Sequence, residues 1–287
     1  MTKKNFSFLK NLPLTKIKIT IAKIMYRFAK VFYGNKPRII TRNGIKYEVD
    51  LSEGIDLSLF FFGSFQQHVI NNSLYKLPAE ATIVDIGANF GIMSLQFARA
   101  ADHGVVYSFE PTHYALSKFK RNLELNPDLS GRIRVVNSFV SATTDSKPNI
   151  KAFSSWKVDG EKSDDMHPVH WGAAKSAEGV GSVTLDDFCR DNHFTKIDFI
   201  KIDVDGHEFE VFKGAGETIR KFRPVVIFEI GLYLLTEKNI EYAFFAGYFS
   251  SLHYKLYDAK NAKEVTPGNY MDLIPAMGTI DIIAIPK

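Results

Sequence analysis

The chain has 287 residues, of which 45% are hydrophobic and 24% charged, a composition typical of a globular protein that buries a full core. This length accommodates one catalytic domain with attachments. A single cysteine, Cys189, excludes an internal disulfide framework and fits a reducing compartment, so we expect a cytoplasmic protein.

The net charge of +4 conceals an asymmetry along the chain. Residues 1–47 carry twelve Lys and Arg and no Asp or Glu, so the remainder holds 24 basic against 32 acidic residues. Because this acidic body would repel phosphate backbones, we expect no nucleic-acid partner.

Residues 1–35 are predicted to contain a basic amphipathic helix. Apolar side chains recur there at helical spacing, and basic side chains lie on the opposite side of the helical wheel. The apolar set is Ile17, Ile21, Ile24, Met25, Phe28 and Phe32, and the basic set is Lys16, Lys23, Arg27 and Lys30. Lysines interrupt the segment too often for a membrane span, and no cleavage site indicates a secretory signal.

Two interpretations of this helix have equal weight. In the first it lies on anionic lipid at the inner face of the membrane, where each Lys or Arg contributes about 1 kcal/mol. In the second it packs its apolar side on the domain or on a second subunit, so a homo-oligomer stays open.

Residues 36–78 are predicted to form a hairpin and cap. Residues 38–51 alternate in hydrophobicity around Asn43-Gly44, the pattern of a two-residue hairpin turn. The Phe-rich segment 55–77 is expected to join the core or to cover a ligand site.

Residues 79–287 alternate short apolar runs with helical patterns, which predicts parallel strands joined by crossover helices. The expected strands are 82–85, 105–109, 133–136, 197–203, 225–230, 254–258 and 280–285. The expected helices are 88–99, 112–125, 206–221 and 236–246. We therefore predict a Rossmann-like α/β fold, with seven parallel-rich strands, an antiparallel last strand and helices on both faces.

The clearest chemical motif follows the first of these strands. Asp85 ends the strand, and a turn with two glycines leads into a helix, whose N-terminal N–H groups can bind a carboxylate or phosphate. The turn lacks the G-x-G-x-x-G spacing of dinucleotide sites, which argues against NAD or FAD. Glu110 ends the second strand, where a carboxylate can accept both hydroxyls of a ribose. The predicted cofactor-binding residues are Asp85, Gly87, Ala88, Asn89, Gly91 and Glu110.

Five ordered segments resemble the FkbM family of S-adenosylmethionine-dependent methyltransferases. Residues 197–215 are similar to the family signature K-I-D-V-E-G-x-E, and 84–89, 109–111, 184–187 and 224–229 match further motifs in the family's order. The chain departs from the pattern at Asp205, where the family more often has Glu, and at Gln66-Gln67, where an acidic residue is common. The resemblance covers roughly residues 38–287 and implies a class I methyltransferase sheet, S-adenosylmethionine as cofactor and O-methylation of a hydroxyl.

An alcohol needs a base before it attacks a methyl group. The candidates at the carboxyl ends of the central strands are Asp203, Asp205, His207, Glu208 and Glu229. We predict Asp203 or His207 as base, with Glu208 positioning the acceptor or His207. Asp203 has the alternative roles of holding Lys201 or capping the next helix. A divalent metal is ranked lower because the sequence gives no dedicated ligand spacing, and we expect none.

The polar stretch 141–181 shows no periodicity and is predicted to be an acceptor-binding insertion. It contains Trp156, Trp171, His167 and His170, which suit stacking on a sugar and hydrogen bonding to its hydroxyls.

The predicted function is thus O-methylation of a saccharide hydroxyl in a surface glycan, glycolipid or secondary metabolite. The alternatives are a catalytically silent nucleoside-binding scaffold and an N-methyltransferase acting on a small molecule. The identity of the acceptor is left open.

Overall fold

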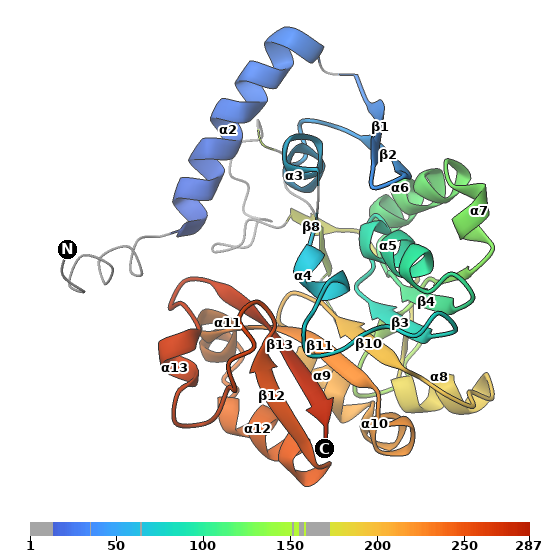
Figure 1. The fold of residues 1–287 in the computed structure, drawn as a ribbon, viewed down its shortest axis with the longest axis vertical. Coiled ribbons are helices and arrows are strands. Elements are labelled where there is room, and N and C mark those ends of the chain that lie inside the picture. The colour runs from blue at the N-terminus through green and yellow to red at the C-terminus, as the bar shows by residue number, and fades with distance from the viewer. Residues whose placement is uncertain (1–13, 35, 64, 151, 155–157, 159–172) are drawn as a thin grey trace, which may run out of the picture.

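A seven-stranded sheet forms the centre of the molecule (Figure 1), in a computed structural model that describes residues 14–34, 36–63, 65–150, 152–154, 158 and 173–287. The strand order is β12-β13-β11-β10-β3-β4-β5. The strands are β3 (Thr82–Ile86), β4 (Val105–Phe109), β5 (Ile133–Val136), β10 (Phe199–Ile202), β11 (Val225–Gly231), β12 (Tyr254–Asp258) and β13 (Thr279–Pro286).

All seven predicted strands are present in this sheet. Strands β3, β4, β5, β10 and β11 run parallel to one another, and β13 is antiparallel to both β11 and β12. Helices lie on both faces (Figure 1), so the predicted Rossmann-like α/β fold with an antiparallel last strand is confirmed.

The helices of this region are α5 (Ile92–Ala100), α6 (His113–Glu124), α7 (Pro127–Ser130), α8 (Leu185–Asp191), α9 (Glu208–Lys213), α10 (Gly216–Phe222), α11 (Leu232–Glu237), α12 (Tyr242–Ser251) and α13 (Tyr270–Leu273). The prediction of one helix over 206–221 is wrong, because the chain breaks between α9 and α10. The Asp186 carboxylate accepts the N–H groups of Glu217 and Thr218 and so starts a new helix there. The prediction of one helix over 236–246 is also wrong: Asn239 has a left-handed φ of 53°, which separates α11 from α12.

Two apolar clusters fill the two faces of the sheet, because successive residues of a strand point to opposite sides. On β10, Phe199 faces one cluster while Ile200 and Ile202 face the other. Helix α12 covers the face to which Ile200 and Ile202 point. There the ring of Phe228 on β11 stacks on the rings of Phe245 and Phe249 on α12. The core is therefore built from the apolar runs that the sequence pattern indicated.

The N-terminal region comprises α2 (Leu14–Tyr33), β1 (Arg38–Arg42), β2 (Ile45–Val49), α3 (Gly54–Phe62) and α4 (Gln67–Ile70). The predicted hairpin is confirmed, with Asn43 and Gly44 at φ 49° and 75° in its turn. The backbone N–H of Glu48 donates to Asn122 Oδ1 of α6 at 2.9 Å, which attaches the hairpin to the central domain.

Helix α2 presents a different side to the protein from the one the sequence pattern emphasised. Tyr26 and Ala29 are buried, whereas Ile24 and Phe28 of the predicted apolar set are 62% and 59% exposed. Within the described part of the chain, no helix combines the length and the apolar character that crossing a bilayer requires.

The insertion 141–181 has more regular structure than its sequence indicated. Within it, strand β7 (Ala152–Ser154) pairs antiparallel with β8 (Ala173–Lys175). The segment is flanked by β6 (Phe139–Val140) and β9 (Ser182–Val183), which pair in parallel and bring its two ends together. The predicted acceptor-binding residues Trp156, Trp171, His167 and His170 lie outside the described residues.

Candidate active site

The loop after β3 is anchored to the neighbouring strands at the carboxyl edge of the sheet. The N–H groups of Gly87 and Ala88 both donate to the carbonyl of Phe109, at 3.0 and 2.9 Å. Gly87 has a φ of 82°, and a Cβ there would lie 1.9 Å from the Asp203 carbonyl oxygen. Only glycine fits this position, so the loop and the ends of β4 and β10 meet at one point.

Glu110 joins this loop to the start of α6. Its Oε2 accepts the Asn89 N–H at 2.9 Å, and its Oε1 accepts the N–H and the hydroxyl of Thr112 at 2.8 and 2.6 Å. The side chain is buried, which raises the pKa of Glu110, although these hydrogen bonds act in the opposite direction. Oε2 accepts one hydrogen bond here, so it has a further lone pair with which to accept a hydrogen bond from a ligand.

Lys201 lies between two carboxylates beneath the loop. Its Nζ is 3.0 Å from Asp203 Oδ2 and 3.8 Å from Asp85 Oδ1, and Ser94 donates to Asp85 at 2.6 Å. Burial alone would raise the pKa of Asp203, but the Lys201 ammonium and the amide of Gln66, at 3.1 Å, hold it below its usual value. The Asp203 carboxylate is therefore ionised, and its contacts with Lys201 and Gln66 fix its orientation.

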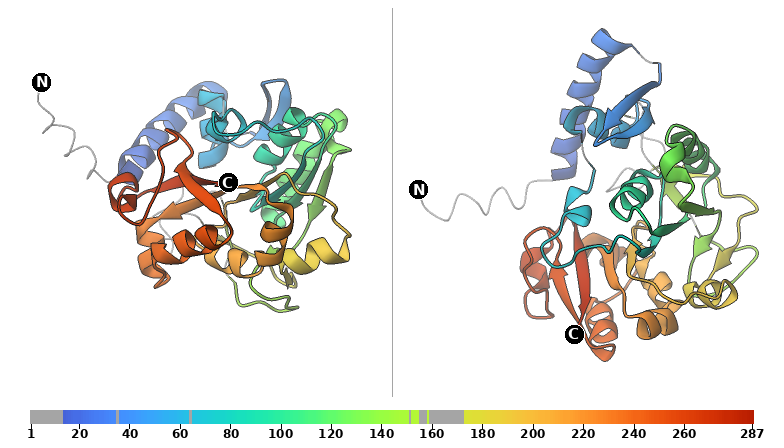
Figure 2. Two further views of the ribbon diagram at one scale, coloured as in Figure 1. Left: turned by 60° about the horizontal axis from the view of Figure 1, so that its bottom comes forward. Right: turned by 45° about the vertical axis from the view of Figure 1, so that its right-hand side comes forward.

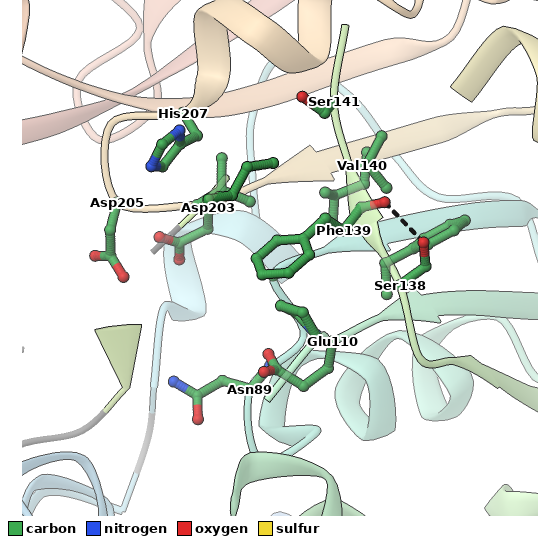
Figure 3. A pocket seen from close by; sticks show the side chains of 15 residues that line it. Asn89, Glu110, Ser138, Phe139, Val140, Ser141, Asp203, Asp205 and His207 are labelled. Carbon is green, nitrogen blue, oxygen red and sulfur yellow. Dashed lines mark hydrogen bonds between the residues drawn. The ribbon is translucent and has the colours of Figure 1, made fainter. Parts of the chain in front are cut away.

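The loop from β10 to α9 is held in an unusual shape by Glu208. Its Oε1 accepts the N–H groups of Val204 and Gly206, at 3.1 and 3.3 Å. Between them Asp205 adopts a left-handed φ of 50°, and Figure 3 shows its side chain beside those of Asp203 and His207. Glu208 is thus placed to shape the loop that carries the other two groups.

Burial and neighbouring charges shift the pKa values of this loop. Burial, then the charges of Asp203 and Glu208, raise the pKa of Asp205 to about 7. Burial, opposed in part by the backbone N–H bonds, raises the pKa of Glu208 to about 7. Burial followed by the nearby Lys238 lowers the pKa of His207 to about 4, so this imidazole is neutral at pH 7.

These elements surround a pocket with about 640 Å³ of empty volume, part of it open to solvent (Figure 3). Six predicted residues line it: Gly87, Asn89, Glu110, Asp203, Asp205 and His207. The predicted residues Asp85, Ala88, Gly91 and Glu208 do not line it. Asp85 acts indirectly, through the Lys201 ammonium that also contacts Asp203, and Glu208 accepts the N–H of Val204 in the lining.

The sequence prediction missed another part of the wall, formed by Ser138, Phe139, Val140, Ser141 and Ile150. A weak signal was available, because Ser138 follows the third strand and ligands bind at strand ends. Gln66 was also missed as a partner of Asp203. Its left-handed φ of 46° has no signature in the residues around it.

Further polar groups lie beyond the pocket at the same edge of the sheet. Thr279 donates to Glu229 at 2.6 Å, and His68 Nε2 lies 2.5 Å from Asp281 Oδ2. Glu229, a predicted base candidate, does not line the pocket. Across the described residues, no cluster of three or more His, Cys, Asp or Glu side chains is arranged to hold a metal ion.

The strand order, the reversed strand β13 and the glycine loop at the end of β3 define a class I methyltransferase with a Rossmann-like fold. The methyltransferase FkbM domain matches residues 85–256, which is more than half of the chain. The chain therefore belongs to the FkbM methyltransferase family, as the sequence motifs predicted.

Individual curated methyltransferases share only about a quarter of their aligned residues with this chain. The chain is 27% identical over 205 residues to methyltransferase sdnD of Sordaria araneosa, covering 64% of this chain and 77% of that protein. It is 26% identical over 162 residues to the 2-O-methyltransferase NoeI of Sinorhizobium fredii, covering 53% of this chain and 63% of NoeI. A crystal structure of methyltransferase FkbM from Methylobacillus flagellatus has a TM-score of 0.48 and 17% identity, and the match covers 79% of this chain and 47% of that one.

Proposed function

We propose that this methyltransferase uses S-adenosylmethionine to O-methylate a hydroxyl, with a saccharide as the acceptor class. The observation that carries the proposal is the pocket at the carboxyl ends of β3, β4 and β10, which Glu110 and Asp203 line from different strands. Open α/β sheets bind their ligands at this edge. The O-methyl specificity is supported by NoeI, whose name is 2-O-methyltransferase. The choice of a saccharide as acceptor is supported by the resemblance to the family.

The residues of the pocket fit this cofactor. Glu110 Oε2 can accept a ribose hydroxyl, and Phe109, Phe139 and Val140 offer apolar contact to a flat base. Asp203 places an ionised carboxylate in the lining of the pocket, which complements the positive charge of a sulfonium.

The cofactor supplies an electrophilic methyl carbon on a sulfonium that leaves as a neutral thioether. The protein has to hold the acceptor oxygen in line with that carbon and remove the hydroxyl proton. The acceptor oxygen forms the new C–O bond while the C–S electron pair returns to sulfur. The proton passes to a base on the protein.

Asp205 suits the role of that base better than the two groups predicted from sequence. It lines the pocket, and a pKa of about 7 lets it accept a proton efficiently near neutrality. Asp203 is held ionised by Lys201 and so suits charge stabilisation. His207 has a pKa of about 4, which makes it a weak base, and it suits hydrogen bonding to the acceptor.

The first experiment is calorimetric titration with S-adenosylmethionine and S-adenosylhomocysteine, with NAD as negative control. We expect saturable binding of both, and a dissociation constant roughly 10–100-fold larger in Glu110→Gln, since a hydrogen bond to a charged group contributes about 1.5–3 kcal/mol. The matched control is Glu80→Gln, at an exposed glutamate outside the pocket. Absence of binding by the wild-type protein would overturn the proposed cofactor, whereas binding without turnover of any acceptor would favour the catalytically silent scaffold.

A second experiment tests the base. With an acceptor that supports turnover, kcat/KM should rise through about pH 7 as Asp205 ionises. Asp205→Asn should lower kcat by roughly 10²–10⁴ and remove this dependence while leaving cofactor affinity within a few-fold. An unchanged pH profile in the variant would assign the base elsewhere, and transfer to amines alone would overturn the O-methyl assignment.

A further inference from the structure

One side of α2 exposes a stripe of large apolar side chains. Ile21, Ile24, Phe28, Val31 and Phe32 are 48%, 62%, 59%, 80% and 66% exposed. The rings of Phe28 and Phe32 lie 4.6 Å apart, centroid to centroid, so they form a continuous surface. Large side chains of this kind scattered singly need no explanation, whereas a contiguous patch indicates a binding surface.

The helix divides into three sectors when its residues are placed at about 100° intervals. Tyr26 and Ala29 lie in the sector that is buried against the protein. Arg27 and Lys30 lie in a basic sector on one side of it, and the exposed apolar stripe occupies the remaining side. One side of α2 is therefore used to attach it, and an apolar side bordered by positive charge is left over.

The position of α2 leaves this side accessible. Figure 1 and the right-hand view of Figure 2 show α2 and the β1–β2 hairpin at the end of the molecule opposite strand β12. Tyr33 at the end of α2 contacts the ring of Phe60 on α3, with centroids 5.2 Å apart. On α3, Phe62 is also exposed, at 66%.

We propose that this surface docks on an anionic lipid membrane. The Phe and Ile side chains would enter the boundary between headgroups and acyl chains, and Arg27 and Lys30 would contact the headgroup phosphates. Charge complementarity selects this occupant: residues 1–47 contain twelve Lys and Arg and no acidic residue. The helix would lie in the plane of the interface, because α2 is long enough for a span but too rich in lysine and arginine to be one.

The same charges argue against a second copy of the chain as the occupant. Pairing two α2 helices along their apolar stripes would bring two acid-free segments together, and the residues flanking the stripe would find no carboxylate partner across the interface. Repulsion between the two basic segments would weaken dimerisation, most strongly at low salt. An anionic surface relieves it.

Flotation of the full-length protein with vesicles tests the proposal. We expect binding to phosphatidylglycerol–phosphatidylcholine vesicles at least about tenfold tighter than to phosphatidylcholine alone, and weaker in high salt. The double variant Ile24→Ser/Phe28→Ser should reduce binding by more than about tenfold. Met271→Ser, at a 68% exposed residue of α13, is the matched control and should bind like the wild type.

The charge contribution is measured with Arg27→Gln/Lys30→Gln, which should weaken binding by about fivefold per charge. Lys120→Gln/Lys260→Gln is the control for loss of two exposed positive charges elsewhere. No flotation of the wild type, or equal flotation of wild type and both α2 variants, would overturn the proposal. A dimer in sedimentation that Phe28→Ser dissociates, without vesicle binding, would assign the face to a second copy. Cofactor affinity is expected to be unchanged in all variants, so this test is independent of the proposed function.

Discussion

Gly87 is the residue where the fold and the site constrain each other most closely. Its positive φ turns the chain out of β3, and its missing side chain lets the loop touch the backbone of Asp203. Any larger residue would push apart two strand ends that both line the pocket. The requirement is thus for contact between backbones rather than for flexibility.

Gly87→Ala should lower the free energy of unfolding by at least about 2 kcal/mol, since it adds a backbone clash to the strain of a positive φ. Gly179→Ala separates the two effects, because Gly179 has a φ of 76° and a Cβ added there would meet nothing within 4 Å. Urea denaturation of both variants measures the difference. Equal losses at the two positions would mean that the Asp203 contact contributes nothing.

Asp205 makes stability depend on pH in a direction opposite to that of an ordinary paired carboxylate. Its folded pKa of about 7 lies above an unfolded value near 4, so the folded state binds the extra proton between these values. Its contribution therefore destabilises the protein progressively as the pH rises from about 4 to 7.

Asp205→Asn removes this cost, so we expect the variant to be more stable than wild type by about 1–3 kcal/mol at about pH 8 and nearly equal to it at about pH 4.5. Asp187→Asn is the control of opposite sign. Hydrogen bonds from Thr144 and then Arg190 lower the pKa of Asp187 to about 2, so its loss should destabilise the protein at pH 7. Thermal melts across this pH range give both differences, and a constant Asp205→Asn difference would contradict the assignment.

The secondary elements differ in how far their sequences determine them. The seven central strands are short apolar runs between turn signals, and each predicted range lies within two residues of the observed ends. The helix breaks at residues 214–215 and 238–241 were missed because they are not marked by a local signal such as proline. Asp186 caps α10 from a helix 31 residues earlier in the chain.

The candidate site divides in the same way. Glycines and strand-end carboxylates were predictable because their chemistry is local: Gly87 permits the turn, and Glu110 directly follows β4. The Gln66–Asp203 contact spans 137 residues, and the Ser138–Ser141 wall depends on the pairing of β6 with β9. No local pattern carries that information.

Asn122 of α6 links three elements through one buried amide. Its Oδ1 accepts the Glu48 N–H of β2, and its Nδ2 donates to the carbonyl of Phe90 in the loop after β3, both at 2.9 Å. Asn122→Leu leaves a buried and a half-buried backbone group unpaired, so we expect a loss of about 2–4 kcal/mol. Lys120→Leu, at an exposed position of the same helix, should change stability by less than about 0.5 kcal/mol. The midpoints of urea denaturation measure the difference between the two variants. A similar effect of both would show that the hydrogen bonds of the Asn122 amide contribute little to stability.

At the scale of the whole molecule, the charge asymmetry follows the architecture. The basic segment forms α2 and the hairpin, and the acidic remainder forms the sheet domain with its pocket. A cationic cofactor would therefore be attracted to the sheet domain, and an anionic membrane to the opposite, N-terminal end of the protein. This separation keeps each interaction from competing with the other.

The N-terminal cap nevertheless shares its core with the sheet. Tyr47 of the hairpin and Leu57 of α3 pack in the same apolar cluster as Phe97 and Phe199, and all four are buried. A boundary near residue 78 would thus cut through a core, and we expect residues 36–287 to unfold as one unit. Calorimetry should give a single transition with a ratio of calorimetric to van't Hoff enthalpy of about one.

Tyr47→Ala tests this cooperativity directly. It should lower the midpoint of the whole transition, with a loss of about 3–5 kcal/mol, because it removes a buried ring from the cluster that both parts share. Phe62→Ala, at a residue that is 66% exposed, should leave the midpoint nearly unchanged. If Tyr47→Ala instead splits the transition into two, the cap and the sheet fold separately, and the shared cluster couples them only weakly.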